Sequence, residues 1–342
     1  AYKDQHTSII IGNAEQTNKE PRGEITLLKY NEDKSGIVPK TTYRLTGPNG
    51  YSKTQTTNDE GKIIVKDLKL GEYTFVEEKA AEGYLINTTP IKVTLSYKDQ
   101  HTEIITGSAE QTNKEPTATV KLKKEDKETG ETAQGDATLA NATYNLIAAE
   151  DIYNKAKSHK FYSKGDVVAT RITDEKGHMD EITKLPLGHY QLIEIEASNG
   201  YLVDKETHDI YCTYEGQTVE VVIRSATSFE QVKKQAFQII KVSTDESGEA
   251  TILPKAEFTV KLSSEIKRVG WDKARTYNVL TTDHKGYAKS IELPYGTYTV
   301  RETKVPDNVM PVKDFTVVVD EDNREPQTWR VFNDAPFKAL IK

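Results

Sequence analysis

Three lysines and three glutamates each close a short run in which every second residue is apolar. Side chains of a strand point alternately to its two faces, so each charged group should point inward with the apolar residues before it. A charged group in a core is costly unless it has a partner or a chemical role. The lysine runs are Ile25-Leu27-Lys29, Val120-Leu122-Lys124 and Phe237-Ile239-Lys241, and the glutamate runs are Tyr73-Phe75-Glu77, Tyr190-Leu192-Glu194 and Tyr298-Val300-Glu302.

A seventh run, Trp329-Val331-Asn333, ends in an inward asparagine. Burial favours the neutral amine of a lysine and the protonated form of a glutamate. A neutral lysine is a nucleophile, and a protonated carboxyl group can polarise an amide carbonyl and transfer protons. A buried lysine, glutamate and asparagine therefore predict an isopeptide bond between lysine and asparagine, made once during folding with loss of ammonia.

The elements that must position these groups occur three times. Each copy has a turn ending in glycine, a Leu-x-x-Gly-x-Tyr step and then the strand that ends in glutamate; the turns span 57–61, 173–177 and 282–286. A repeat of this regularity predicts tandem domains. Alternating runs separated by turn signals, without a long amphipathic helix, predict antiparallel β-sandwiches of about six to eight strands each. Placed end to end, such domains would form a rod. The turn glycines are expected at positive φ.

Residues 2–21 and 97–116 are nearly the same sequence. We therefore interpret residues 1–22 as the last strand and linker of a preceding repeat, and expect the parent protein to carry more repeats. The polar segment 110–116 ends in proline, which is typical of a linker.

These boundaries predict a first domain at 23–109, a second at 117–228 and a third at 235–342. Residues 148–166 are an insertion in the second domain, and its first residues are expected to form a short helix. A brief helical connector is expected over 228–235.

Composition excludes several classes of function. The chain has 342 residues and a net charge of −7, so it offers no basic face to nucleic acid. No apolar run is long enough to cross a bilayer. Cys212 is the single cysteine and is expected to fill the core, and the seven histidines show no metal-ligand spacing. We expect no metal and no cofactor, and we expect Trp271 to have a packing role.

Several motifs together resemble the collagen-adhesin B-type (CnaB) repeats of Gram-positive stalks and pilins, and the resemblance covers essentially the whole chain. In the third domain they are Phe237-Gln-Ile-Ile-Lys241, residues 253–258, residues 293–304 and Val-Phe-Asn333; the other domains match through 71–77 with 82–84 and 188–194 with 199–201. The resemblance implies an inverse-immunoglobulin, transthyretin-like sandwich. It also implies an isopeptide bond in which Lys241 is the amine, Asn333 the acceptor and Glu302 the catalyst.

Two domains depart from this pattern at the acceptor position. There we place Ser108 after the alternating pair Ile104 and Thr106, and in the second domain Ser225, or Arg224 if the register of that strand shifts by one residue. Serine has no carboxamide to attack. We therefore predict no bond in the first two domains, where the pairs Lys29/Glu77 and Lys124/Glu194 would remain as buried contacts of uncertain net value.

Asn13 occupies the acceptor position in the segment before the first domain. Its partner is expected to be a lysine of the preceding domain. An alternative is strand exchange, in which residues 2–13 of one molecule replace the matching strand of another and present Asn13 to its Lys29.

These observations and the resemblance together predict a structural stalk segment of a cell-surface adhesin or pilus-like protein. It would be extracellular, and either anchored to the cell wall or associated with a pilus of a Gram-positive bacterium. Its partners would be neighbouring repeats, and its only reaction would be its own single-turnover crosslinking. The alternative is a ligand-binding adhesin module for a host matrix protein or glycan, acting through the insertion of the second domain, because long non-repeat loops often carry function. A third reading is the accessory domain of an exported enzyme.

Overall fold

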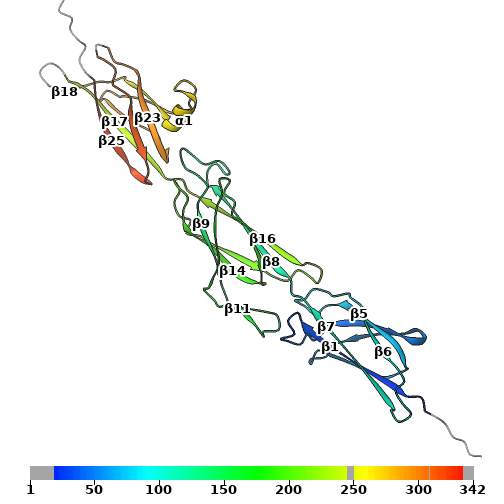
Figure 1. Ribbon diagram of the computed structural model, residues 1–342. Coiled ribbons are helices and arrows are strands. Elements are labelled where there is room, and N and C mark those ends of the chain that lie inside the picture. Colours follow the sequence, from blue (N-terminus) through cyan, green and yellow to red (C-terminus); the bar gives the residue numbers. More distant parts are fainter. Residues whose placement is uncertain (1–18, 245–249, 308, 334–342) are drawn as a thin grey trace, which may run out of the picture. The chain divides into compact units, whose positions relative to one another are not determined.

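The computed structural model describes residues 19–244, 250–307 and 309–333, which form mainly β-strands (Figure 1). Within this part of the chain, three sandwich domains follow one another in sequence. The predicted all-β fold with tandem sandwiches is confirmed. The α-helix α1 (Ser263–Val269) is short, and no helix among these residues is long and apolar enough to span a membrane.

Domain 1 packs the sheet β4-β1-β7 against the sheet β3-β2-β5-β6. The inward residues of the alternating runs meet in its core, among them Ile25, Leu27, Tyr43 and Phe75, which are fully buried. A single 3-10 turn, η1 (Pro48–Gly50), joins two of the strands. The strands are β1 (Arg22–Asn31), β2 (Thr42–Gly47), β3 (Tyr51–Thr56), β4 (Lys62–Leu68), β5 (Gly71–Lys79), β6 (Ile91–Leu95) and β7 (Ile104–Asn113).

Domain 2 has the same plan, with the sheet β13-β8-β16 and the sheet β12-β9-β14-β15, and a separate hairpin β10-β11. The hairpin lies in the insertion 148–166, so the short helix expected there is wrong. The strands are β8 (Thr117–Asp126), β9 (Thr143–Ala148), β10 (Ile152–Tyr153), β11 (Lys160–Tyr162), β12 (Val167–Ile172), β13 (Ile182–Leu185), β14 (Gly188–Glu196), β15 (Thr207–Cys212) and β16 (Val221–Glu230).

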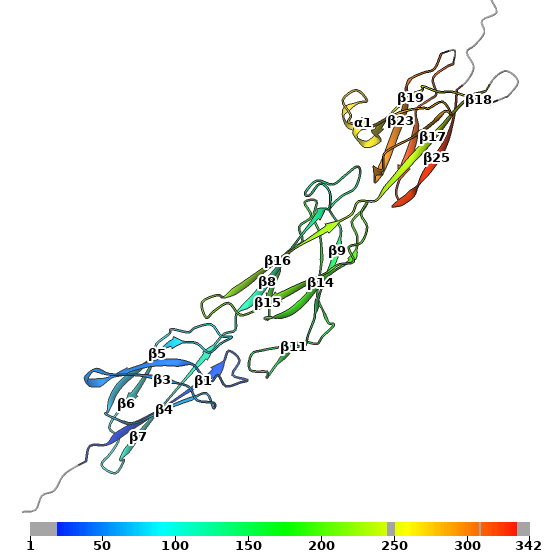
Figure 2. The same cartoon turned by 180° about the vertical axis from the view of Figure 1, so that it is seen from behind.

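Domain 3 places β17 at the centre of a five-stranded sheet and packs it against the sheet β20-β19-β23-β24. Figure 2 shows α1 beside β19 and β23. Because β16 ends at Glu230 and β17 begins at Lys234, the helical connector expected over 228–235 is also wrong. The strands are β17 (Lys234–Thr244), β18 (Ala250–Ile252), β19 (Glu257–Leu262), β20 (Thr276–Thr281), β21 (Tyr287–Lys289), β22 (Leu293–Pro294), β23 (Gly296–Lys304), β24 (Phe315–Val319) and β25 (Asn323–Asn333).

The first and last strands of every domain run side by side in parallel, in otherwise antiparallel sandwiches. β1 pairs with β7, β8 with β16 and β17 with β25. A parallel pair cannot be joined by a hairpin, so the intervening strands of the domain form the crossover between the two. The two strands that begin and end each domain are therefore direct neighbours, and a side chain at the end of one can reach the end of the other.

Candidate functional site

Each domain buries a lysine from its first strand beside a glutamate from the opposite sheet. The inward orientation expected from the alternating runs is confirmed: the three lysines are completely buried and the three glutamates at most 7% exposed. The pairs are Lys29 with Glu77, Lys124 with Glu194 and Lys241 with Glu302.

In domain 3 the three predicted residues come together. Lys241 Nζ lies 3.4 Å from Glu302 Oε1, and Asn333 Nδ2 donates to Glu302 Oε2 at 3.3 Å. The Val312 backbone N–H donates to the same oxygen at 2.9 Å and holds the carboxyl group in place. Lys241 Nζ and Asn333 Oδ1 are both buried, and neither makes a hydrogen bond to the described residues. Glu302 Oε1 is likewise buried without a hydrogen-bond partner, and three unsatisfied polar atoms in one buried site are unusual in a folded protein.

Domain 1 contains a complete set of the same three groups, which the sequence analysis did not recognise. Lys29 Nζ donates to Glu77 Oε2 at 2.8 Å and to Asn113 Oδ1 at 2.5 Å. Asn113 Nδ2 donates to Glu77 Oε1 at 2.7 Å. The lysine also donates to Gln111 Oε1 at 3.0 Å. Amine, carboxyl group and carboxamide therefore form one closed hydrogen-bonded cluster in the core.

The prediction that Ser108 holds the acceptor position of domain 1 is wrong. Ser108 is exposed and lies opposite Thr26, whereas Gln111 lies opposite Lys29. The strand β7 continues past the expected domain boundary at residue 109 to Asn113, so most of the segment interpreted as a linker is strand. The inward side chains of this last part of β7 are polar, so the alternation of apolar and polar residues that marks a strand is not visible in the sequence.

In each domain the acceptor position lies two residues beyond the residue that faces the lysine. Asn113 lies opposite Asn31, and Asn333 lies opposite Ser243. In domain 2 the same ladder position, opposite Asp126, is held by Glu230. Glu230 is 1% exposed, and its Oε2 contacts Lys124 Nζ.

The prediction that Ser225 is the acceptor position of domain 2 is wrong for the same reason as in domain 1. Ser225 is exposed and faces Lys121, whereas Ser228 faces Lys124. The strand β16 extends two residues beyond the expected end of domain 2 and brings Glu230 to the lysine.

Asn13 and the exchange segment 2–13 lie outside the described residues. By sequence alone, Asn18 and not Asn13 matches Asn113 in the repeated segment.

Burial makes the lysines easier to deprotonate. Desolvation lowers the pKa of Lys29 to about 8, and the hydrogen bond that Lys29 donates to Glu77 only partly opposes this. Desolvation also lowers the pKa of Lys124 to about 8 and lowers the pKa of Lys241. Burial raises the pKa of the Glu194 carboxyl group. The environment therefore increases the fraction of the neutral amine, which is the nucleophilic form.

The glycine of the repeated turn holds the backbone of each lysine, a role that the sequence analysis missed. The hydrogen bonds run from Lys29 N–H to Gly61 O (2.8 Å), from Lys124 N–H to Gly177 O (2.7 Å) and from Lys241 N–H to Gly286 O (2.7 Å). The three glycines have φ of 66°, 79° and 68°, so the expected positive φ is confirmed. The signal was present in the sequence, because each turn glycine lies 16 or 17 residues before the buried glutamate of its domain.

Other candidate residues have ordinary structural environments. Cys212 is buried at 2% exposure in domain 2. The ring of Trp271 stacks under Arg301, whose guanidinium carbon lies 3.9 Å from the ring centre, and Lys261 Nζ lies 5.1 Å from it. No group of three His, Cys, Asp or Glu side chains in the described residues is arranged to hold a metal ion.

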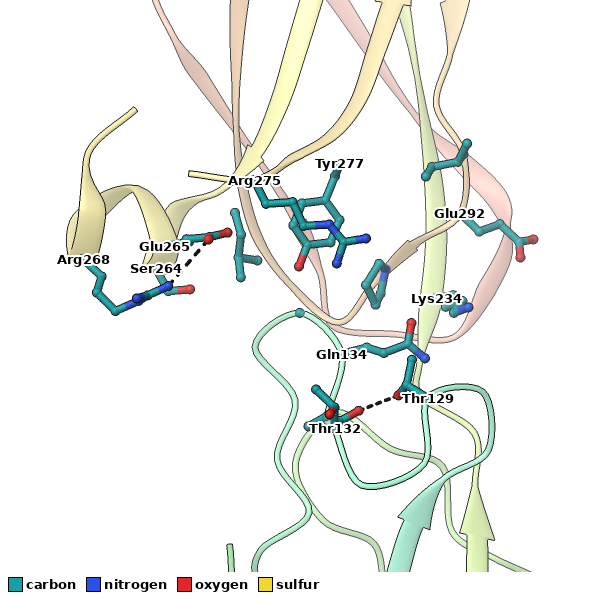
Figure 3. A pocket seen from close by; sticks show the side chains of 15 residues that line it. Thr129, Thr132, Gln134, Lys234, Ser264, Glu265, Arg268, Arg275, Tyr277 and Glu292 are labelled. Atoms are coloured by element: carbon teal, nitrogen blue, oxygen red, sulfur yellow. Dashed lines mark hydrogen bonds and ion pairs between the residues drawn. The ribbon is translucent and has the colours of Figure 1, made fainter. Parts of the chain in front are cut away.

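A cavity of about 770 Å³ lies within the compact unit that contains domains 2 and 3 (Figure 3). Gln134 lines the cavity, together with positively and negatively charged side chains from residues 234–292. The Arg275 guanidinium lies 5.0 Å from the ring centre of Tyr277. The charged lining residues are Lys234, Glu265, Arg268, Arg275 and Glu292.

Comparisons with known proteins agree with this architecture. A family profile described as SpaA, prealbumin-like fold domain, matches residues 23–111, 118–227 and 229–331. A search of curated proteins found no significant match. Among solved structures, the Bacillus anthracis TIE protein is 24% identical with a TM-score of 0.65. The match covers 92% of this chain and 51% of the TIE chain, so this chain spans about half of that protein.

Two pilus proteins also match at lower structural similarity. The major pilin subunit BcpA of Bacillus cereus is 15% identical with a TM-score of 0.37, and the match covers 92% of this chain and all (100%) of BcpA. The pilus adhesin SpaC of Lactobacillus rhamnosus GG is 16% identical with a TM-score of 0.37, covering 92% of this chain and 44% of SpaC. The family profile covers most of the chain in three consecutive copies. The chain therefore belongs to the SpaA family and consists of three tandem prealbumin-like fold domains.

Proposed function

We propose that this chain is a structural stalk segment of a Gram-positive cell-surface pilin or adhesin, and that Lys–Asn isopeptide bonds lock its first and third domains. The observation that carries the proposal is the burial of an amine, a carboxyl group and a carboxamide together at the ends of the first and last strands. The sets are Lys29, Glu77 and Asn113 in domain 1 and Lys241, Glu302 and Asn333 in domain 3.

The chemistry requires only groups that the domains already contain. The neutral lysine Nζ attacks the asparagine Cγ, and the glutamate accepts a proton from the amine and returns it to the leaving nitrogen. One amine and one carboxamide become one amide and one ammonia, and the glutamate is regenerated. The hydrogen bond from Asn113 Nδ2 to Glu77 Oε1 places the proton carrier at the group that must leave.

In domain 3, bond formation would also resolve an unfavourable feature of the site. Lys241 Nζ and Asn333 Oδ1 are buried without hydrogen bonds. A buried polar atom without a partner costs about 1–3 kcal/mol. In the product, the charged amine is replaced by a neutral amide that needs only one donor and one acceptor interaction. The cost of holding an amine in the core is thereby removed.

The position of the bond suits a protein under tension. Tension enters a domain at the start of its first strand and leaves at the end of its last strand. A bond from Lys29 to Asn113, which are 84 positions apart, would carry that force from one strand to the other. The strands between them would then bear no load. Closing a loop of this length also stabilises the fold by about 4–5 kcal/mol in the loop-entropy treatment used for disulfides.

This proposal assigns the chain no catalysis on external substrates. Each glutamate would act once, on its own domain. Neighbouring repeats of the same surface protein would be its structural partners, and attachment to the cell wall would come from the rest of that protein.

Intact-mass spectrometry of the full chain, followed by peptide mapping, tests the proposal. We expect the loss of one ammonia each from domains 1 and 3. Branched peptides should join Lys29 to Asn113 and Lys241 to Asn333. An intact mass equal to the sequence mass would refute the proposed crosslinks.

A second candidate function is ligand binding by an adhesin module, and the cavity lined by Arg268, Arg275 and Glu292 is the observation that favours it. Clefts that combine a few charged groups with an aromatic ring are typical ligand sites. Binding of the full chain to matrix proteins and glycan arrays would measure this function. Loss of a detected ligand in an Arg275→Ala variant would assign it to the cavity, whereas no binding would leave the stalk role alone.

A further inference from the structure

On the basis of the function proposed above, we propose that domain 2 closes the same loop with a carboxylic acid as acceptor. Lys124 Nζ would form an amide with Cδ of Glu230, and the leaving molecule would be water instead of ammonia. Glu194 would transfer the proton. This assigns a crosslink to the domain that lacks an asparagine at the acceptor position.

The strand register supports this assignment. Glu230 lies opposite Asp126, two residues beyond Ser228, which faces Lys124. Asn113 and Asn333 hold the corresponding ladder positions in the other two domains. Glu230 is therefore placed by the backbone in the acceptor position, and its Oε2 contacts Lys124 Nζ.

The charges in the site favour condensation over a simple ion pair. Lys124 is completely buried, and it faces two buried carboxyl groups, Glu194 at 3.4 Å and Glu230. One ammonium group can balance only one carboxylate, so the second carboxyl group is driven towards its protonated form. A protonated carboxyl group can be attacked by an amine, whereas a carboxylate resists attack.

Nearby groups strengthen this effect. Asp126 Oδ2 accepts from the Tyr201 hydroxyl at 2.7 Å, and the Tyr201 ring centre lies 4.8 Å from Lys124 Nζ. Asp204 Oδ2 accepts from Ser228 Oγ at 2.9 Å and lies 3.1 Å from His208 Nε2. The aspartates add negative charge around the site and further disfavour two ionised glutamates.

Glu194 is held in the orientation that the proton transfer needs. Its Oε2 accepts the backbone N–H of Asp204 at 2.5 Å, and its Oε1 faces Lys124 Nζ. Glu302 is held in the same way by the N–H of Val312 in domain 3.

Tyr144 supplies a group that domain 3 lacks. Its hydroxyl donates to Glu230 Oε1 at 2.5 Å, and Ser228 Oγ lies 3.4 Å from the same oxygen. Negative charge develops on this oxygen when the amine adds to Cδ, and a donor already in place stabilises it. The residue of domain 3 that pairs with the catalytic glutamate in the same way is Phe258. Domain 1 also has a tyrosine at this position, Tyr43, but its hydroxyl donates to Gln111 Oε1 at 2.7 Å. Among the three domains, the hydroxyl donates to the acceptor side chain in domain 2.

The reaction balances without any further reactant. The Lys124 amine adds to Glu230 Cδ, and the proton that it releases passes to Glu194. Glu194 returns a proton to the departing hydroxyl group, which leaves as water. One amine and one carboxylic acid become one amide and one water, and no electron donor or acceptor is needed.

Peptide mapping of the full chain and of Glu230→Gln and Glu230→Ala variants tests the inference. The wild-type chain should give a branched peptide joining Lys124 to residue 230 with loss of one water. Glu230→Gln should give a branched peptide of identical mass, because a glutamine acceptor loses ammonia and leaves the same amide. Glu230→Ala should give no branch in domain 2.

The Tyr144→Phe variant tests the stabilising role of the hydroxyl group. It leaves the buried Lys124 in place, so the test does not require a variant that removes this lysine to fold. Domain 3 tolerates phenylalanine at the corresponding position, so the variant should fold. Bond formation in domain 2 should slow about 100-fold, so fresh protein should contain an uncrosslinked fraction that declines on incubation.

Domains 1 and 3 serve as internal controls in the same digest. Linear peptides containing Lys124 and Glu230, found together with crosslinked peptides from domains 1 and 3, would overturn this inference and leave the proposed function standing. Linear peptides from all three domains would overturn both. Complete crosslinking of fresh Tyr144→Phe at the wild-type rate would contradict the assigned role of the hydroxyl.

Discussion

The carboxamide of Asn113 donates a 2.7 Å hydrogen bond to Oε1 of Glu77 in the core of domain 1. The other oxygen of the same carboxyl group accepts from Lys29. One buried acid thus touches both groups that the proposed reaction joins, and it lies where a proton can pass from the amine to the leaving nitrogen. This geometry supports Asn113 as the acceptor of the proposed bond, a role that the serine at position 108 cannot fill.

Replacing Asn113 by alanine should abolish the crosslink of domain 1, whereas replacing Ser108 should leave it intact. Asn113→Ala removes the carboxamide, and the buried Lys29 and Glu77 then remain as an unreacted pair. Ser108 is exposed and contributes nothing to the site. Peptide mapping of the two variants gives the answer directly, and the crosslink of domain 3 should persist in both.

Thermal unfolding adds a second measure for this pair of variants. Loss of the loop closure should destabilise domain 1 in Asn113→Ala by about 4–5 kcal/mol in the loop-entropy treatment, while Ser108→Ala should change stability by about 0.5 kcal/mol or less. Equal crosslinking in the two variants would show that the acceptor has been misassigned.

The sequence was sufficient to predict the core of the fold, the lysine and glutamate of every site, and the complete set of three residues in domain 3. In the runs ending at Lys29 and Glu77, every second residue before the charged group is apolar, so their inward faces could be recognised. The same is true of the closing strand of domain 3, where Trp329 and Val331 precede Asn333. Apolar residues before the functional group made the strand and its register visible.

The acceptors of domains 1 and 2 could not be predicted in this way. The inward face of β7 passes from Ala109 through Gln111 to Asn113, and a polar run of this kind is typical of a linker. Its buried polar groups are satisfied by residues that are distant in the sequence, such as Tyr43, whose hydroxyl donates to Gln111 Oε1 at 2.7 Å. Periodicity within one segment carries no information about such partners.

Gly286→Ala should disturb the site of domain 3 through the backbone. A Cβ added at Gly286 would lie 2.5 Å from the carbonyl oxygen of Lys241, and the residue has φ of 68°. We expect destabilisation of about 1–3 kcal/mol and a larger uncrosslinked fraction in fresh protein, measured by urea unfolding and by mass spectrometry.

Gly270→Ala is the matched control for this change. Gly270 also has positive φ, 83°, but an added Cβ would meet no atom within 4 Å. The Gly270→Ala variant should therefore show only the cost of placing alanine at positive φ, and its domain 3 should crosslink normally. If both variants crosslink to the same extent, the turn glycine does not position the lysine.

An uncrosslinked domain 1 should become more stable as the pH rises above about 8. In Asn113→Ala, Lys29 stays a free amine beside Glu77. Burial lowers its folded-state pKa from 10.5 to about 8. Below pH 8 both the folded and the unfolded chain hold the proton. Between about pH 8 and pH 10.5 only the unfolded chain holds it, so the free energy of unfolding increases with pH.

Calorimetry of Asn113→Ala and of the double variant Asn113→Ala/Lys29→Met measures this effect. The contributions of all other titrating groups cancel in the difference between the two free energies of unfolding. It should be constant below about pH 7 and should shift in favour of Asn113→Ala up to about pH 10.5. A difference that is independent of pH over this range would show that Lys29 is not desolvated.

Glu302→Gln should prevent the crosslink of domain 3 while preserving its fold. The amide oxygen of glutamine can still accept the Val312 N–H, which now donates to Glu302 Oε2 at 2.9 Å. An amide cannot carry the proton from the amine to the leaving group, so Lys241 and Asn333 should remain unjoined.

Tryptophan fluorescence reports this domain selectively, because the two tryptophans of the chain, Trp271 and Trp329, both lie in domain 3. Its urea midpoint should fall in Glu302→Gln, with a loss of about 4–5 kcal/mol. The crosslink of domain 1 is the internal control. Normal crosslinking of domain 3 in this variant would remove Glu302 from the mechanism.

Cys212 should act as a reporter of unfolding in domain 2. It is the only cysteine of the chain, it is 2% exposed, and burial raises the pKa of its thiol to about 11. The thiolate is the reactive form, so the folded protein should react very slowly with thiol reagents at neutral pH. In increasing urea, labelling should begin only where domain 2 opens.

The same thiol distinguishes a covalent from an ionic contact between Lys124 and Glu230. With an amide bond, Glu230→Gln should be labelled at the same urea concentration as the wild type, because both chains carry the same bond. Glu230→Ala should be labelled at a clearly lower concentration. With an ion pair, Glu230→Gln would lose the charge, and its labelling would shift towards that of Glu230→Ala. Rapid labelling of the folded wild-type chain would contradict the buried position of Cys212 and remove the basis of the measurement.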